Sequence, residues 1–211
     1  NHWEKIFHLK PPKLYAKGDV IISQGEDNQN IFYIDRGLVE YTYTDKTGAE
    51  NLIEVLGEGN MLNLQPVFGK NPSIATFFAL TDSKLYALSA TEVREHMMKD
   101  KFLVEELLEE MAIVIGGLNR QTCISAEKSN SRLLQILFML AENKLRKNPD
   151  IDHVRIRLSQ DDLARITRLT RVTVSKILSD LRHKSIIETD YGEIVIMDME
   201  TLRELSTSAE Y

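Results

Sequence analysis

The sequence predicts an α+β fold in which an N-terminal antiparallel β-roll, or double-stranded β-helix, precedes a long helix and a smaller helical domain. Three observations support this prediction. Short runs of β-branched and aromatic residues alternate with turn residues over 18–90, a proline-free apolar repeat follows from Lys101, and a helix–break–helix–hairpin pattern fills the C-terminal third. We expect domains at 1–100, 101–129 and 130–211.

Residues 18–90 have the pattern of many short strands. Alternating or apolar runs occur in DVIISQ, NIFYIDRG, LVEYTYTD, ENLIEVLG, SIATFFALTD and KLYALS. Seven of the ten glycines fall between Gly18 and Gly69, mostly between these runs, where tight turns need a positive φ. Short strands separated by such turns are typical of an antiparallel sandwich or roll.

The pattern becomes helical at Thr91, a capping-type residue, and a longer helix is expected from Lys101. Along this helix apolar residues recur at spacings of four and three, as in a coiled coil: Leu103, Leu107, Met111, Val114 and Leu118. A second apolar face lies beside the first, formed by Val104, Leu108 and Ile115. We expect one face to pack on the roll and the other on a second copy of the chain, and the alternative is a helix buried within one chain.

The C-terminal part opens with an amphipathic helix, SRLLQILFMLAENKL, that ends before Pro149. A short strand, HVRIRL, is followed by SQDDLARI, a helix with Ser159 as its expected N-cap and Asp162 three residues later. A second helix is expected from about Arg171 to Lys184, and then a hairpin in IIETDYGEIVIMD. This order of elements is a winged helix-turn-helix.

Composition limits the class of protein. A hydrophobic fraction of 43 % in 211 residues allows packed cores. The single cysteine, Cys123, excludes a disulfide framework and an iron–sulfur or all-cysteine zinc site within one chain, and fits a reducing cytoplasm. No apolar run reaches the length of a membrane span, and the start NHWEKIF is not a signal peptide. We therefore expect a cytoplasmic protein.

No enzyme chemistry is indicated by the sequence. It has no clustered histidines and carboxylates at metal-ligand spacing and no evident pair of nucleophile and base. We expect no catalytic residue, no metal and no cofactor, because the histidines that a haem sensor would use, His96 and His153, are isolated.

Charge is distributed unevenly. The chain carries a net charge of −6, but residues 153–184 hold eight basic and three acidic residues, so this window is +5 and the remainder is −11. A basic segment on an acidic protein is a plausible electrostatic footprint for nucleic acid. The alternative is a solvated helix surface with a few charges.

The second helix of the helix-turn-helix has two faces. Its apolar residues, Val174, Ile177, Leu178 and Leu181, are expected to pack against Leu163 and Ile166 of the first helix. The remaining face carries Arg171, Val172, Ser175, Lys176 and Ser179. Thr170 is placed to cap the helix, whose first N–H groups could bind a phosphate. Because an α-helix fits the major groove, this face is a candidate for DNA recognition.

The segment SQDDLARITRLTRVTVSKIL resembles the DNA-binding signature of the cyclic-AMP receptor protein and fumarate–nitrate regulator (Crp/Fnr) family of bacterial transcription factors. The order of roll, long dimerisation helix and winged helix-turn-helix resembles that family over essentially the whole chain. The resemblance implies a homodimeric regulator that binds a palindromic operator, more often an activator contacting RNA polymerase. It implies that DNA contacts come from Thr170, Arg171, Val172, Thr173, Ser175 and Lys176, with Arg168 and Gln160 beside them.

Two residues depart from the family pattern of the helix-turn-helix. Val172 stands where the family usually has a glutamate, which accepts from cytosine N4. Valine cannot accept, and its methyl groups suit the thymine C5-methyl, so we predict an A·T-rich half-site. Arg168 stands where the turn usually has glycine. Either it bears the strain of a positive φ, about 1–2 kcal/mol, or the turn is wound differently, or Arg168 adds a phosphate contact.

In cyclic-nucleotide members of the family, a glutamate holds the ribose and an arginine pairs with the phosphate. Here Asn63 and Leu64 stand where Gly-Glu would be, Ser73 and Ile74 stand where Arg-Ser would be, and Ala75 resumes the pattern. An anionic phosphate needs a cation or several N–H donors. We therefore expect an effector other than cyclic AMP, one that is apolar or aromatic and contacts Leu64, Ile74, Phe77 and Phe78. Chlorophenol-sensing members also have valine at the position of Val172.

Two adjacent glycines inside the long helix weaken it, and such pairs permit close approach of a ligand, a kink, or tight helix packing. By resemblance, Gly117 and Leu118 lie where an effector meets this helix across the dimer. The alternative is a regulator with no ligand in the roll, binding DNA constitutively or switched by oxidation of Cys123.

Overall fold

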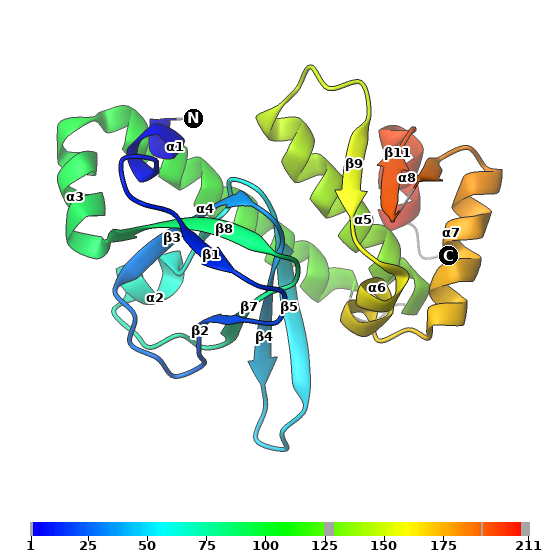
Figure 1. Cartoon of the computed structure of the whole chain (residues 1–211), viewed down its shortest axis with the longest axis horizontal. Coiled ribbons are helices and arrows are strands. Elements are labelled where there is room, and N and C mark those ends of the chain that lie inside the picture. The colour runs from blue at the N-terminus through cyan, green and yellow to red at the C-terminus, as the bar shows by residue number, and fades with distance from the viewer. Residues whose placement is uncertain (1, 125–128, 191, 208–211) are drawn as a thin grey trace. The chain divides into compact units, whose positions relative to one another are not determined.

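The computed structural model of the chain describes residues 2–124, 129–190 and 192–207, without the side chains of 113, 116–124, 129–130 and 147. The chain forms two compact units, residues 1–120 and 121–211 (Figure 1). Within the described ranges, no helix combines the length and the apolar character that crossing a membrane requires.

Unit 1 is built on two four-stranded antiparallel sheets. In the first, the strand order is β1 (Lys13–Tyr15), β8 (Ser83–Ser89), β3 (Asn30–Arg36) and β6 (Met61–Leu62). In the second, the order is β2 (Val20–Ile22), β7 (Thr76–Ala79), β4 (Val39–Thr44) and β5 (Glu50–Leu56). This confirms the predicted antiparallel roll, although β1 and β6 were not predicted. Strands of two or three residues are too short to show a period of two.

The apolar run in β3 is continuous because the strand is buried on both faces. Ile31 and Tyr33 point to a cluster shared with helices, whereas Phe32 and Ile34 point to the cluster between the two sheets. Successive side chains of a strand alternate between faces. We call the cluster that contains Ile31 and Tyr33 the helix-side cluster; its other members include Trp3, Phe7, Met61, Leu64, Val67, Tyr86, Leu88, Val93, Leu103 and Leu107. We call the cluster that contains Phe32 and Ile34 the inter-sheet cluster; its other members include Ile21, Ile22, Val39, Leu56, Leu62, Phe77 and Leu85.

Four helices belong wholly or in part to this unit: α1 (His2–Phe7), α2 (Leu64–Gly69), α3 (Ala90–Lys99) and α4 (Lys101–Ile124). The prediction of Thr91 as the capping residue of α3 is wrong. Ser89 is the N-cap, and it forms a reciprocal capping box in which its hydroxyl accepts from the Glu92 backbone and the Glu92 carboxylate accepts from the Ser89 backbone. The last residue of β8 thus starts the helix, because its backbone is still extended there.

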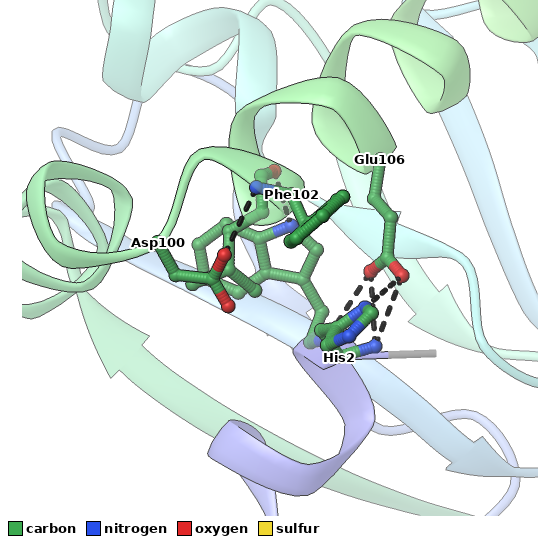
Figure 2. A network of polar contacts seen from close by, with 6 residues as sticks. His2, Asp100, Phe102 and Glu106 are labelled. Atoms are coloured by element: carbon green, nitrogen blue, oxygen red, sulfur yellow. Dashed lines mark hydrogen bonds and ion pairs between the residues drawn. The ribbon is translucent and has the colours of Figure 1, made fainter.

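The N-terminal helix α1 is fixed to the first turns of α4 (Figure 2). The Glu106 carboxylate accepts from the backbone N–H groups of His2 and Trp3 and lies 2.7 Å from His2 Nδ1. The His2 ring stacks on Phe102 with centroids 5.8 Å apart. The buried Trp3 indole donates to the Leu103 carbonyl at 2.9 Å. A carboxylate of one helix therefore caps the N-terminus of another.

Unit 2 contains the end of α4, helix α5 (Ser129–Lys147), strand β9 (Val154–Arg157), helices α6 (Gln160–Thr167) and α7 (Arg171–His183), strands β10 (Ile187–Asp190) and β11 (Glu193–Ile196), and helix α8 (Met199–Thr207). The three strands form one antiparallel sheet in the order β10-β11-β9. This is the predicted winged helix-turn-helix. Gly192 has the positive φ, +84°, that the tight hairpin turn requires.

Candidate functional site

The turn between α6 and α7 begins at Arg168. This arginine has φ 57° and ψ 31°, and its N–H donates to the carbonyls of Ala164 and Arg165. The positive φ confirms the strained interpretation, in which a residue with a Cβ occupies a left-handed conformation at a cost of about 1–2 kcal/mol. The interpretation that Arg168 adds a phosphate contact stays a prediction. The side chain of Arg168 is exposed.

The start of α7 is capped as predicted. Thr170 has extended backbone angles, and its Oγ1 accepts from the Thr173 N–H at 3.1 Å. The two hydroxyl oxygens are 2.8 Å apart, so the Thr173 side chain also contacts the cap. Both threonines lie at the positive end of the helix dipole, where an anion is stabilised.

The apolar face of α7 packs as the sequence predicts. Val174, Ile177, Leu178 and Leu181 are all buried, and so are Leu163 and Ile166 of α6. The opposite face is exposed at Arg171, Val172, Ser175 and Lys176, and half-buried at Ser179. An exposed fraction of 78 % for Val172 is high for an aliphatic side chain. The structure therefore presents one polar face of α7, with Val172 near its N-terminal end.

One neighbour of this face was not identified from the sequence. Asp161, the second residue of α6, places Oδ1 3.5 Å from Arg171 Nε, and both side chains are largely exposed. Its position ten residues before Arg171 has no helical or strand periodicity, so only the turn that brings α6 beside α7 reveals it. The predicted neighbour Gln160, the first residue of α6, is half-buried.

Two further charges of the basic window lie on the sheet beside the helices. Arg155 and Arg157 are exposed on β9, and both pair with Glu193 of β11. The hydrogen bond from Arg157 is the main reason that the pKa of Glu193 lies below its usual range. Part of the +5 charge is thus neutralised across the sheet, and Arg165, Arg168, Arg171 and Lys176 leave basic charge on α6, the turn and α7.

In the roll, the first two residues predicted for effector binding lie at the start of α2. Asn63 is a left-handed residue with φ 69°, buried, and its Nδ2 donates to the carbonyls of Asn28 and Asn30 at 2.7 and 2.9 Å. Its Oδ1 is buried and has no hydrogen-bond partner among the described residues. Leu64 is 9 % exposed and belongs to the helix-side cluster.

The next group of predicted residues precedes β7 or lies on it. Ser73 is buried and its hydroxyl donates to the Ala75 carbonyl at 2.7 Å, whereas Ile74 is 53 % exposed. Ala75 is fully buried. Phe77 belongs to the inter-sheet cluster and stacks on Tyr41 with centroids 4.2 Å apart.

The structure thus brings Ser73 and Ala75 together but places Leu64 and Phe77 in separate clusters. Phe78 is half-buried on β7. Gly117, Leu118 and Cys123 belong to α4 but lie outside the residues whose side chains are described.

A carboxyl pair between the roll and α4 was also missed. Burial first, and the nearby Glu110 second, raise the pKa of Glu54 on β5 to about 7. Tyr41 is its cross-strand partner, and burial together with Glu54 raises the pKa of Tyr41 to about 12. The Asn60 amide donates to Glu110 Oε1 at 2.8 Å, which connects the loop after β5 to α4. In the described residues, no group of three or more His, Cys, Asp or Glu side chains could hold a metal ion.

The long helix α4 exposes an apolar face. Leu103 and Leu107 are buried in the helix-side cluster, which confirms that one face packs on the roll. On the second face Leu108 and Ile115 are 60 % and 55 % exposed, and Val104 is half-buried. Exposed aliphatic residues at such spacing are typical of a helix that pairs with another helix.

Comparison with known proteins gives two matches to protein families. Residues 12–100 match the cyclic nucleotide-binding domain, and residues 131–205 match the Crp-like helix-turn-helix domain. The chain is similar to the CRP-like cAMP-activated global transcriptional regulator of Mycobacterium tuberculosis, with 22% identity over 90% of this chain and 86% of that protein.

Two solved structures share the fold. FixK2 from Bradyrhizobium japonicum has a TM-score of 0.72 with 17% identity, over 94% of this chain and 98% of that chain. The structure of OCPA-complexed CprK has a TM-score of 0.61 with 18% identity, over 95% of this chain and 93% of that chain.

Proposed function

The chain belongs to the Crp/Fnr family of transcriptional regulators, whose members are not enzymes, and we propose that it is a DNA-binding dimer controlled by a small molecule in its roll. The observation that carries the proposal is the exposed face of α7. Arg171, Val172, Ser175 and Lys176 project from a helix whose opposite face is fully packed and whose first turn is capped by Thr170. Such a helix fits the major groove with its N-terminal residues at the base edges.

The operator we propose is palindromic and A·T-rich. Val172 is the most exposed apolar residue of α7, so a thymine methyl can reach it, and it offers no acceptor to cytosine N4. Arg171 and Lys176 contact bases or phosphates on either side. Thr170, Thr173 and Arg168 lie at or just before the N-terminal end of α7, where phosphates are expected, and we propose that Gln160 contributes from the start of α6.

Selection of bound sequences from a random duplex library tests this operator. We expect enriched half-sites that carry thymine where Val172 enters the groove, at two positions about one helical turn apart. Enrichment of cytosine at that position would contradict the proposal.

The dimer interface we propose is the second apolar face of α4. Val104, Leu108 and Ile115 would pair with the same residues of a second copy around a two-fold axis. A two-fold dimer presents two recognition helices to two symmetric half-sites, so the palindrome follows from the dimer. We propose that the regulator works in the cytoplasm and more often activates than represses, through contact with RNA polymerase.

The effector we propose is apolar or aromatic rather than cyclic AMP. Neither Asn63–Leu64 nor Ser73–Ile74 supplies the carboxylate and the guanidinium that a ribose and a cyclic phosphate would need. We propose that Asn63, Leu64, Ser73, Ile74, Ala75 and Phe77 contribute from the roll and Gly117 and Leu118 from α4.

One observation favours a second candidate, a regulator with no ligand in the roll. Asn63 and Ser73 already bond to backbone carbonyls, and Leu64 and Phe77 are packed in different clusters. A regulator of this kind would bind DNA constitutively or respond to oxidation of Cys123.

Thermal-shift screening of the full chain with cyclic AMP, 2-oxo acids and substituted phenols separates the two candidates. A rise in melting temperature with a phenol or an aromatic acid, together with altered operator affinity, supports an effector. A strong rise with cyclic AMP would contradict our assignment of the Asn63 and Ser73 positions. Unchanged operator affinity across the whole set favours the ligand-free regulator.

A further inference from the structure

The ion pair between Asp161 and Arg171 places a carboxylate at the surface that we assign to DNA. Both partners come from unit 2, Asp161 from the first turn of α6 and Arg171 from the first turn of α7. The side chains are 70 % and 68 % exposed, and the Nε–Oδ1 distance is 3.5 Å. An ion pair so exposed contributes little to folding. Its consequence is therefore expected in binding, where the same guanidinium meets DNA.

Contact through Nε matters because a guanidinium has two edges that can form paired hydrogen bonds. One edge presents Nε–H with one Nη group, and the other presents the two Nη groups. Asp161 lies at the Nε edge, so the edge with two Nη groups stays available for an acceptor in the groove. A second anion at the Nε edge, such as a backbone phosphate, would meet the Asp161 carboxylate.

From this geometry we propose that Asp161 is a specificity-determining residue. It orients Arg171 toward base edges and prevents the same side chain from acting as a general phosphate contact. The inference rests on the proposed DNA-binding function and deepens it. Contacts to phosphates give affinity for any sequence, whereas contacts to base edges distinguish sequences. Asp161 thus lowers affinity for non-specific DNA more than it lowers affinity for the operator.

The test compares two duplexes with the full-length chain. One duplex is the operator recovered by selection from a random library, and the other is a scrambled duplex of equal length and composition. Affinities are measured by fluorescence anisotropy over a series of salt concentrations, for the wild type, Asp161→Asn, Arg171→Ala and the double variant. The specificity ratio is the affinity for the operator divided by the affinity for the scrambled duplex.

We expect Asp161→Asn to raise affinity for the scrambled duplex about three- to tenfold, since one negative charge beside a phosphate is removed. Affinity for the operator should change less than about twofold, so the specificity ratio falls. For the scrambled duplex, the slope of the logarithm of affinity against the logarithm of salt concentration should become more negative by about 0.9, the value for one added phosphate contact. In the Arg171→Ala background, Asp161→Asn should leave the specificity ratio unchanged.

Asp152→Asn is the matched control, because it removes the same charge from an exposed residue in the same unit. Figure 1 shows its loop, between α5 and β9, at the end of α5 remote from α6. This variant should leave the specificity ratio unchanged. Melting temperatures of all variants are measured too, and none should shift appreciably, because the ion pair is exposed.

Three results would overturn the role of Asp161: equal rises in affinity for both duplexes, a fall in the ratio that persists without Arg171, or the same fall in Asp152→Asn. The first would indicate a general charge effect with no orientation of Arg171. A different result overturns the proposed function itself, namely that the wild type and Arg171→Ala bind both duplexes equally or not at all. The two failures are therefore distinguishable.

Discussion

The two units differ in where their candidate functional residues lie. In unit 2 the residues assigned to DNA, from Arg171 to Lys176, are mostly exposed on one face of a helix. In unit 1 most residues assigned to an effector are buried, and Asn63 and Ser73 are engaged in hydrogen bonds to backbone carbonyls. A surface that binds a rigid polymer can be complete before the partner arrives. A ligand that enters a packed roll has to displace contacts that already stabilise it.

The largest expected effect concerns two adjacent residues of α4. Leu107→Ala should destabilise the protein by about 2–5 kcal/mol, because Leu107 is 4 % exposed and packs in the helix-side cluster. Leu108→Ala, at an exposed position, should change the stability of the monomer by only about 0.5 kcal/mol but weaken the dimer. Denaturant unfolding and sedimentation equilibrium measure the two effects. Similar losses of stability would contradict the assignment of the two faces.

Arg171 and Lys176 should each contribute to DNA binding but not to the stability of the fold. Alanine at either position should weaken operator binding by about 1–3 kcal/mol, since each is exposed on the recognition face, and leave the melting temperature unchanged. Arg203→Ala is the control, because Arg203 is exposed on α8 of the same unit. Fluorescence anisotropy measures the operator affinity of the three variants. Equal affinities would contradict the assignment of α7 to the DNA interface.

Val172 allows a test of sequence preference. Val172→Glu restores an acceptor for cytosine N4, so the selected half-site should gain a cytosine, with a discrimination of about 1–3 kcal/mol. Val172→Ile keeps an aliphatic side chain and should keep the original half-site. Selection from random duplexes measures both. An unchanged half-site in Val172→Glu would mean that residue 172 does not reach the base edges.

The carboxyl pair at the roll provides a pH-dependent test of unit 1. The pKa of Glu54 is raised from 4.5 to about 7 by burial and by Glu110, so the folded protein keeps this proton over a range in which the unfolded chain has released it. Stability should therefore fall as pH rises from about 4.5 to 7, and should level off above that range.

Glu54→Gln should remove this fall and stabilise the protein at pH 8 by about 1–2 kcal/mol. Glu50→Gln, at an exposed position of the same strand, should leave the pH dependence intact. Urea denaturation across the pH range measures both variants. A Glu54→Gln variant with the wild-type pH dependence would show that another group is responsible.

The smallest effect is expected at the turn of the helix-turn-helix. Arg168→Gly should stabilise unit 2 by about 0.5–1 kcal/mol, because glycine adopts φ 57° without strain, and the gain is reduced by the greater freedom of glycine in the unfolded chain. Arg165→Gly, inside α6, should instead destabilise by about 1 kcal/mol. Destabilisation by Arg168→Gly would show that the arginine side chain contributes more than the strain costs.

Unit 2 was predicted from the sequence except for helix α8, which was missed, and the reason for the success is local. The caps Ser159 and Thr170, the buried face of α7 and the hairpin around Gly192 all depend on residues within one or two turns of chain. The roll was predicted only as a class, because β1 and β6 are too short to show periodicity. The capping of α3 was assigned two residues too late, since Ser89 also ends a strand.

The sequence by itself determined the order of roll, long helix and winged helix-turn-helix, the polar face of α7 and the loss of both charged anchors in the roll. These properties follow from residue identity and short-range spacing. Only the tertiary structure showed that Asp161 reaches Arg171, that burial and the nearby Glu110 raise the pKa of Glu54, and that Leu64 and Phe77 belong to different clusters. Each of these relations depends on how strands and helices pack, which the spacing of residues along the chain does not reveal.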